Sequence, residues 1–180
     1  MQDYLSFHLS CEDESMYEQL PDNSLILRFT IPGRPSTKKT SQRVVRRGRY
    51  TKILPSALYE RYELHCKEYC EFFWSRFKLK PIDFGIGIKL KVYLDSWIVG
   101  DECGYQQAHG DIIQKHGIIA DDMWIHWIDR NSHMIHYDKE NPRVEVEIYR
   151  YRHPKEQFRN EKLEKEAIKE AKKKNKTIKE

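Results

Sequence analysis

The chain has 180 residues, of which 39% are hydrophobic and 33% charged, and a formal net charge of +4. This composition fits one globular domain with charged appendages, and no apolar run approaches the roughly 20 residues that span a bilayer. The first residues show neither the basic start nor the apolar stretch of a secretory signal, so we expect a cytoplasmic location with reduced cysteines.

The charge is distributed unevenly along the chain. Residues 1–23 hold six acids and no Lys or Arg, whereas residues 34–52 hold eight Lys or Arg and no acid. Residues 151–180 hold eleven Lys or Arg against six acids. This asymmetry favours a polyanionic partner such as nucleic acid. A further hypothesis is that the acidic extension covers the basic segment when no nucleic acid is bound.

The first half of the chain alternates strand and helix patterns. A strand is predicted over residues 24–31, followed by a basic loop over 34–52 with a hairpin around Gly48. An apolar stripe over 55–77 predicts a helix with Pro near its first turn. Strict apolar alternation then predicts a strand over 84–99.

The second half begins with a predicted helix over 104–116, which Gly117 ends as a left-handed C-cap. Long strands are predicted over 123–136 and 143–151. Residues 155–176 are rich in Lys and Glu and poor in apolar side chains, so we expect an exposed helix or a disordered tail. The fold class is therefore α+β, with a mixed sheet and two main helices.

The central segment VGDECGYQQAHGDIIQKHGIIADDMWI concentrates carboxylates at the ends of apolar stretches. Asp101 and Glu102 precede the predicted helix, Asp111 lies within it, and Asp121 and Asp122 follow an Ile-Ile-Ala run. Oxygen-only ligands of this kind suit Mg²⁺ or a similar hard cation. The alternative is that these acids only cap a helix and a turn.

The same segment and the upstream LRFTIPGRPSTKKTSQRVVRRGRYT resemble the two characteristic regions of the RusA-like Holliday junction resolvases of phage and prophage origin. The match covers residues 25–150, and the order and spacing of the acids carry most of it. The resemblance implies a homodimer in a bacterial or phage-infected cell that nicks four-way DNA junctions symmetrically in recombination and repair. It also implies a domain division into residues 1–23, 24–151 and 152–180.

Carried over residue by residue, the resemblance assigns the catalytic acids. Asp101 matches the first catalytic Asp, Asp122 the catalytic member of the later pair, and Asp111 the Asp within the helix, with Asp121 beside Asp122. The metal ligands implied are Asp101, Asp122, Asp121 and Glu102. The ion implied is Mg²⁺, with Mn²⁺ as the alternative, and we expect no small-molecule cofactor and no membrane partner.

Three positions depart from the family pattern. Cys103 replaces the second catalytic Asp, Gly104 an Asn, and Gln107 a Lys. A thiol is a soft, poor ligand for Mg²⁺ and shifts such a site toward Mn²⁺ or Zn²⁺. The alternative function is therefore a catalytically impaired dimer that binds DNA junctions or a replication partner.

The predicted DNA contacts come from the basic loop and from one amide, with a solvated charged surface as the alternative. They are Arg34, Lys38, Lys39, Arg43, Arg46, Arg47, Arg49 and Gln107. Trp124 and Trp127 are predicted to be core or dimer-interface residues rather than base-stacking platforms. A zinc site at Cys103, His109 and His116 is disfavoured, because their spacing is not that of common zinc ligands.

Overall fold

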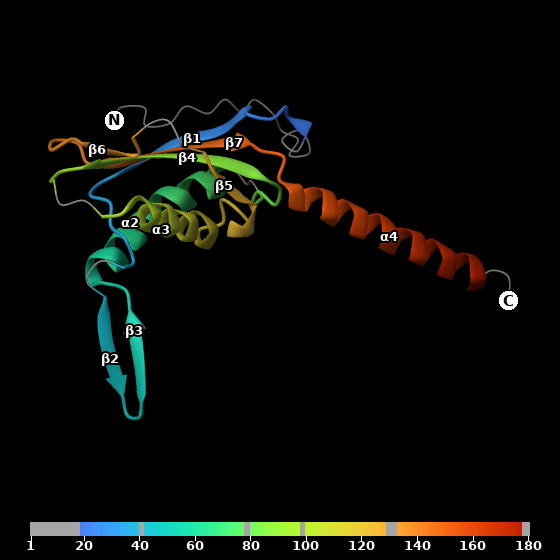
Figure 1. Ribbon diagram of the computed structural model, residues 1–180, viewed down its shortest axis with the longest axis horizontal. Coiled ribbons are helices and arrows are strands. Elements are labelled where there is room, and N and C mark those ends of the chain that lie inside the picture. The colour runs from blue at the N-terminus through green and yellow to red at the C-terminus, as the bar shows by residue number, and fades with distance from the viewer. Residues whose placement is uncertain (1–18, 40–41, 78–79, 98–99, 129–132, 178–180) are drawn as a thin grey trace.

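The fold is α+β, with a mixed sheet, three long helices and a separate hairpin among the residues described (Figure 1). The computed structural model describes residues 19–39, 42–77, 80–97, 100–128 and 133–177. The predicted fold class is confirmed, whereas most of the predicted acidic extension lies outside the described residues. Within these ranges, every helix is too short or too polar to cross a membrane.

The helices and strands follow the predicted order, except that one predicted strand is divided into shorter elements. They are β1 (Leu25–Pro32), β2 (Arg43–Arg47), β3 (Tyr50–Leu54), α2 (Ala57–Phe77), β4 (Ile86–Leu94), α3 (Glu102–Lys115), the 3₁₀ turn η1 (Asp122–Trp124), β5 (Ile125–Trp127), β6 (Ile135–Tyr137), β7 (Arg143–Arg150) and α4 (Pro154–Thr177).

The main sheet has the order β1-β7-β4-β5, and β6 pairs with the same edge of β4 as β5. β7 runs antiparallel to both β1 and β4, whereas β5 and β6 run parallel to β4. Every second residue of β7 is buried, which is the pattern of a sheet with one face on the core and the other in water. The two faces therefore differ in chemistry.

Helices α2 and α3 cover the core face of the sheet (Figure 1). Their buried side chains include Tyr62 and Cys66 from α2 and Ile112 from α3, which join the Ile and Val side chains of the strands. Ion pairs occupy the opposite face, where Arg28 lies 2.6 Å from Glu147. The core thus fixes α3, which carries most of the predicted acids, against the sheet.

The predicted long strand over 123–136 is wrong, because the structure divides it into η1, β5 and β6. Trp127 pairs with Ile88 and Ile135 with Val92. Eight positions thus separate the two pairs on this segment, but only four separate them on β4. The surplus residues cannot pair in register, so the strand is interrupted between β5 and β6.

Both main helices begin at caps that the sequence encodes. The side chain of Ser56 accepts a hydrogen bond from the Tyr59 backbone N–H at 3.1 Å, so Ser56 caps α2. The predicted start at Pro55 is two residues before the observed start at Ala57. α3 begins two residues before the predicted start and ends as predicted, with Gly117 at φ +78°. A positive φ favours Gly at that position.

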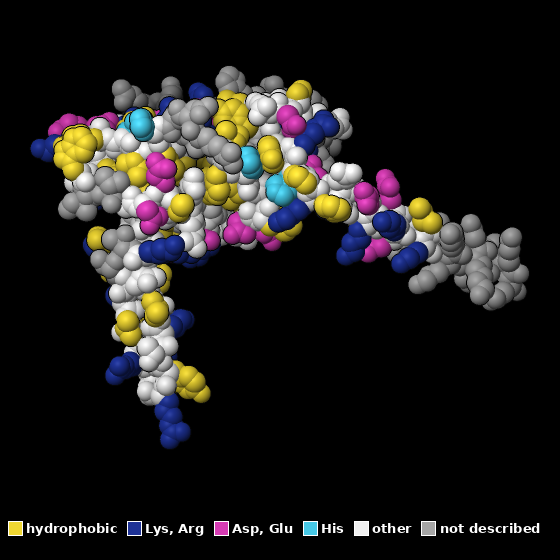
Figure 2. All heavy atoms as spheres, viewed as in Figure 1, with side chains coloured by type: hydrophobic (Ala, Val, Ile, Leu, Met, Phe, Trp, Pro, Cys, Tyr) yellow, Lys and Arg dark blue, Asp and Glu magenta, His cyan; other side chains and the backbone are white. Residues whose placement is uncertain are grey.

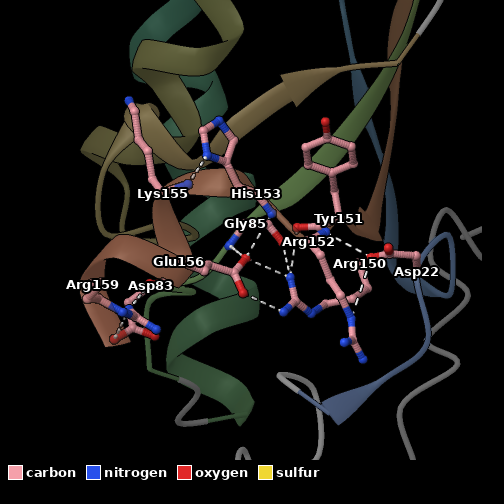
Figure 3. A network of polar contacts seen from close by, with 10 residues as sticks. All are labelled: Asp22, Asp83, Gly85, Arg150, Tyr151, Arg152, His153, Lys155, Glu156 and Arg159. Atoms are coloured by element: carbon pink, nitrogen blue, oxygen red, sulfur yellow. Dashed lines mark hydrogen bonds and ion pairs between the residues drawn. The ribbon is translucent and has the colours of Figure 1, made fainter. Parts of the chain in front are cut away.

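A buried ion pair joins α4 to the sheet (Figure 3). Arg150, at the end of β7, donates to both carboxylate oxygens of Glu156 at 2.9 and 2.7 Å, and the Gly85 N–H donates to Oε1 at 2.7 Å. Burial opposes the charged form of Glu156, but these hydrogen bonds outweigh it and hold the pKa of Glu156 below its usual range. The first turn of α4 is therefore fixed, while the rest of the helix projects from the body (Figure 1).

Candidate functional site

The basic loop contains an isolated β-hairpin that projects from the body of the molecule (Figure 1). β2 and β3 pair from Arg43 with Leu54 to Arg47 with Tyr50, and Gly48 has φ +61° at the first position of the two-residue turn. That position requires Gly in the hairpin turns that match strand twist. The predicted hairpin is confirmed, and its strand residues are exposed except Leu54, which is half-buried.

Basic and apolar side chains share the surface of this hairpin, and no acidic side chain interrupts them (Figure 2). Tyr50 is 82% exposed, and Val44 and Ile53 form an exposed apolar pair. A two-stranded hairpin that buries so little surface is marginally stable by itself in water. The hairpin therefore contributes little to the core.

Three of the predicted DNA-binding cations have protein partners. Arg43 donates to the Pro55 carbonyl at 3.0 Å and to Glu60 at 2.6 Å, which clamps the base of the hairpin to α2. Arg34 lies 3.3 Å from Asp95. The third, Lys38, forms an ion pair with Asp111.

The remaining predicted cations are more available. Lys39, Arg46, Arg47 and Arg49 are exposed, and Lys52 is exposed on β3. None of these five side chains forms a hydrogen bond or ion pair with another residue in the described part of the chain. The hairpin tip thus presents uncompensated positive charge.

Two of the predicted catalytic acids act as caps. The Asp101 carboxylate accepts a hydrogen bond from the Gly104 backbone N–H and so caps α3. Asp121 accepts from the Met123 N–H at 2.8 Å and caps η1. A Cβ at position 104 would lie 2.8 Å from Asp101 Oδ1. Glycine at position 104 therefore leaves room for the capping carboxylate of Asp101, which a larger side chain would displace.

Two other acids line one cavity of about 370 Å³ between α3, η1 and β5. Asp111, Cys103 and Gln107 line it from α3, and Asp122 lines it from η1. Its complete lining is Cys103, Gln106, Gln107, Gly110, Asp111, Asp122, Ile125 and Trp127. Asp111, Asp122 and Gln107 thus line one cavity, whereas Asp101, Glu102 and Asp121 are not part of this lining.

The carboxylate of Asp111 is in contact with a cation from the basic loop. The ammonium of Lys38 forms an ion pair with Asp111 and lies 5.7 Å from the ring centre of Tyr59. Lys38 also lines a second cavity of about 610 Å³ on the other side of Asp111. Asp111 therefore lines both cavities, and its carboxylate is paired with the ammonium of Lys38.

The predicted metal ligands, all of them described residues, are not gathered into one group. Among the residues that the structure describes, no group of three or more His, Cys, Asp or Glu side chains is placed to hold a metal. Glu102 and Cys103 are exposed in the first turn of α3, and the other predicted ligands either form caps or lie apart. Cys103 is exposed whereas His109 is buried.

His109 connects the two core helices. The Tyr62 hydroxyl lies 2.8 Å from Nε2 of His109, and Nδ1 lies 2.7 Å from the Tyr105 carbonyl. Since the carbonyl only accepts, Nδ1 carries the proton and Nε2 accepts from Tyr62. Burial lowers the pKa of His109 to about 4, so the ring is neutral at pH 7. This contact fixes the position of α3 and therefore of Asp111.

Trp124 and Trp127 occupy core positions, as predicted, and the structure adds an exposed aromatic pair that was not predicted. Trp124 is buried and Trp127 packs against the core, so neither is a stacking platform. One exposed aromatic surface away from the hairpin is Trp97, which is 78% exposed and stacks on Tyr137 with ring centres 4.4 Å apart. Sequence reasoning missed this pair, although Trp97 follows the end of the strong alternation in β4.

Comparisons with known proteins give no match, either to a protein-family model or to a curated protein. The likeness to RusA-like resolvases thus rests on the motif residues alone.

Proposed function

We propose that this protein binds branched DNA through the β2–β3 hairpin, as a non-catalytic junction-binding member of the RusA-like type. The observation that carries the proposal is the projecting hairpin with uncompensated cations at its tip (Figure 2). Contacts to phosphates supply affinity and carry little sequence information. A surface of this kind suits recognition of DNA shape, which is what distinguishes a junction from a linear duplex.

The dimensions of the hairpin support this binding mode. Each strand has five residues, which corresponds to about 17 Å of extended chain. The major groove of DNA admits a two-stranded ribbon of this size. The clamp between Arg43 and Glu60 holds the base of the hairpin, so the tip is presented in a defined direction from the body.

Exposed aromatic surface adds to the support. Trp97 and Tyr137 form a flat stacked pair, and aromatic side chains bind unpaired bases of any sequence by stacking. Unpaired or unstacked bases occur at branch points and are scarce in linear duplex. A homodimer, as the resemblance implies, would present two hairpins to the arms of one junction.

The second candidate is the metal-dependent endonuclease that the resemblance implies. One observation favours it: Asp111 and Asp122 line the same cavity, together with Gln107. Phosphodiester hydrolysis in this class uses a divalent ion to polarise the phosphate. The capping roles of Asp101 and Asp121 and the Lys38 ion pair at Asp111 make binding the better-supported function.

The two candidates are separated by incubating the protein with a synthetic four-way junction and, separately, with a linear duplex of the same sequence. Each is tested with Mg²⁺, Mn²⁺ or EDTA, beside an Asp122→Asn variant. Preferential junction binding that persists in EDTA, without nicking, supports the binding function. Metal-dependent nicking that Asp122→Asn abolishes supports the endonuclease instead, and equal affinity for junction and duplex contradicts both.

A Cys103→Asp variant extends this experiment. If it nicks junctions where the natural chain does not, the natural chain has lost catalysis through that substitution. Sedimentation of the protein alone and with junction tests the proposed homodimer, since one junction should carry two copies.

A further inference from the structure

Tyr50 is the aromatic residue of the projecting hairpin, and it lies at the tip (Figure 1). It pairs with Arg47 immediately before the turn, whereas Arg43 and Leu54 form the cross-strand pair at the base. Four steps along the strand separate these pairs, which places Tyr50 about 14 Å beyond the base of the hairpin. The major groove of DNA is about 8.5 Å deep, so a side chain at the tip can reach the base pairs from outside the duplex.

The ring of Tyr50 is available on both of its faces. The residue is 82% exposed, and within the part of the chain that the structure describes no other ring stacks on it. Trp97 differs, because Tyr137 already covers one face of its indole. A ring that enters a base stack contacts a base on each side, and only a ring with two free faces suits that position.

Positive charge borders this ring on its own face of the hairpin. Arg47 lies directly across from Tyr50, and Lys52 shares its face because side chains two positions apart on a strand point the same way. Both cations are exposed, and the sequence of the hairpin contains no carboxylate that would compete with phosphate for them. An aromatic ring beside such cations has the chemistry that binds unstacked nucleic acid, where base stacking and phosphate contacts act together.

We propose that Tyr50 stacks on an open base-pair face, so that the protein prefers DNA whose base stack is interrupted, at a branch point or at a gap. This inference rests on the proposed DNA binding by the hairpin and adds what the hairpin selects. Insertion into a continuous duplex must first unstack a base step, which costs free energy. At an interruption that cost is absent. The cations thus supply affinity for every DNA, and Tyr50 supplies the difference between an interrupted duplex and a continuous one.

The test compares two labelled duplexes of one sequence, the first continuous and the second with a one-nucleotide gap, by fluorescence anisotropy with the full-length chain. The gap opens base-pair faces without the shape of a four-way junction. The natural chain should bind the gapped duplex at least about fivefold more tightly than the continuous one. Tyr50→Leu keeps an apolar side chain without a ring and should lose that preference, whereas Tyr50→Phe keeps the ring and should retain it.

Phe158→Leu is the matched control for the loss of an exposed aromatic ring. Phe158 is 70% exposed on α4, which projects from the body in a different direction from the hairpin (Figure 1). This variant should therefore keep the preference of the natural chain for the gapped duplex. Circular dichroism confirms that each variant is folded.

Several outcomes would overturn this inference while the proposed DNA binding stands. One is equal affinity of the natural chain for the two duplexes, and another is a gap preference that survives in Tyr50→Leu. Loss of the preference in Trp97→Leu but not in Tyr50→Leu would assign it to the other aromatic surface. Loss of self-association in Tyr50→Leu, measured by sedimentation without DNA, would assign the ring to a contact between copies. Failure of the natural chain to bind any of these DNAs would overturn the proposed function as well.

Discussion

The hairpin tip should determine how strongly DNA binding depends on salt. Arg46, Arg47, Arg49 and Lys52 are exposed, and within the described residues none of the four has an acidic partner. Each phosphate that they neutralise releases a condensed counterion, so the logarithm of the association constant falls linearly with the logarithm of salt concentration. Replacing the three arginines with glutamine removes three of the four charges and keeps polar side chains of similar length.

The structure sets the magnitude of this effect. Four phosphate contacts give a slope of about −3.6, which corresponds to about a hundredfold loss of affinity between 50 and 200 mM salt. With Lys52 as the only remaining contact of the four, the slope should fall to about −0.9. Affinity at low salt should therefore fall steeply in the triple variant, and the two proteins should converge at high salt.

Fluorescence anisotropy of a labelled four-way junction, titrated at several salt concentrations, measures the slope. Arg43→Gln is the matched control, because Arg43 is already paired with Glu60 and should contribute little to counterion release. The reasoning is refuted if the triple variant keeps the slope of the natural chain. It is also refuted if Arg43→Gln lowers the slope by as much as a tip arginine does.

Two predictions concern stability. The pKa of His109 is about 4 in the fold and about 6.5 when unfolded, so the unfolded state binds the extra proton between these values. The contribution of His109 to the free energy of unfolding should thus be constant above pH 6.5 and fall by about 3 kcal/mol on acidification to pH 4. Urea titrations of the natural chain and of a His109→Phe variant at each pH measure this contribution. An equally steep fall in the variant would contradict the prediction. Glu156→Gln removes the carboxylate that pairs with the buried Arg150 guanidinium and should cost about 3 kcal/mol of stability, measured by thermal unfolding. Glu161→Gln, on the exposed face of α4, is the control and should cost less than about 0.5 kcal/mol. Equal losses in the two variants would show that the buried pair has no special role.

Local sequence signals predicted the helices well. α3 was found from its apolar spacing and from Gly117, whose positive φ confirms the predicted C-cap. The alternative role of Asp101 and Asp121 as caps could also be read from the sequence, because a capping carboxylate binds backbone N–H groups only a few residues away. Such interactions depend on short stretches of chain and so leave a local pattern.

The broken strand shows where local signals fail. Apolar residues continue across β5 and β6, but the register with β4 requires a surplus of residues between Trp127 and Ile135. Register depends on the partner strand, which the sequence of this segment does not contain. The same limit applies to α4, because its helical pattern gives no indication that Arg150 and Gly85 hold its first turn.

The sequence by itself determined the α+β class, the basic hairpin and the positions of the acids along the chain, since these follow from periodicity, turn residues and charge. Only the tertiary structure decided what the acids contact. Lys38 and Asp111 are 73 positions apart in the sequence, and nothing local to either residue predicts that one neutralises the other. The pair exists because packing brings α3 against the segment that precedes the hairpin, and that packing makes a predicted catalytic acid, Asp111, one half of an ion pair.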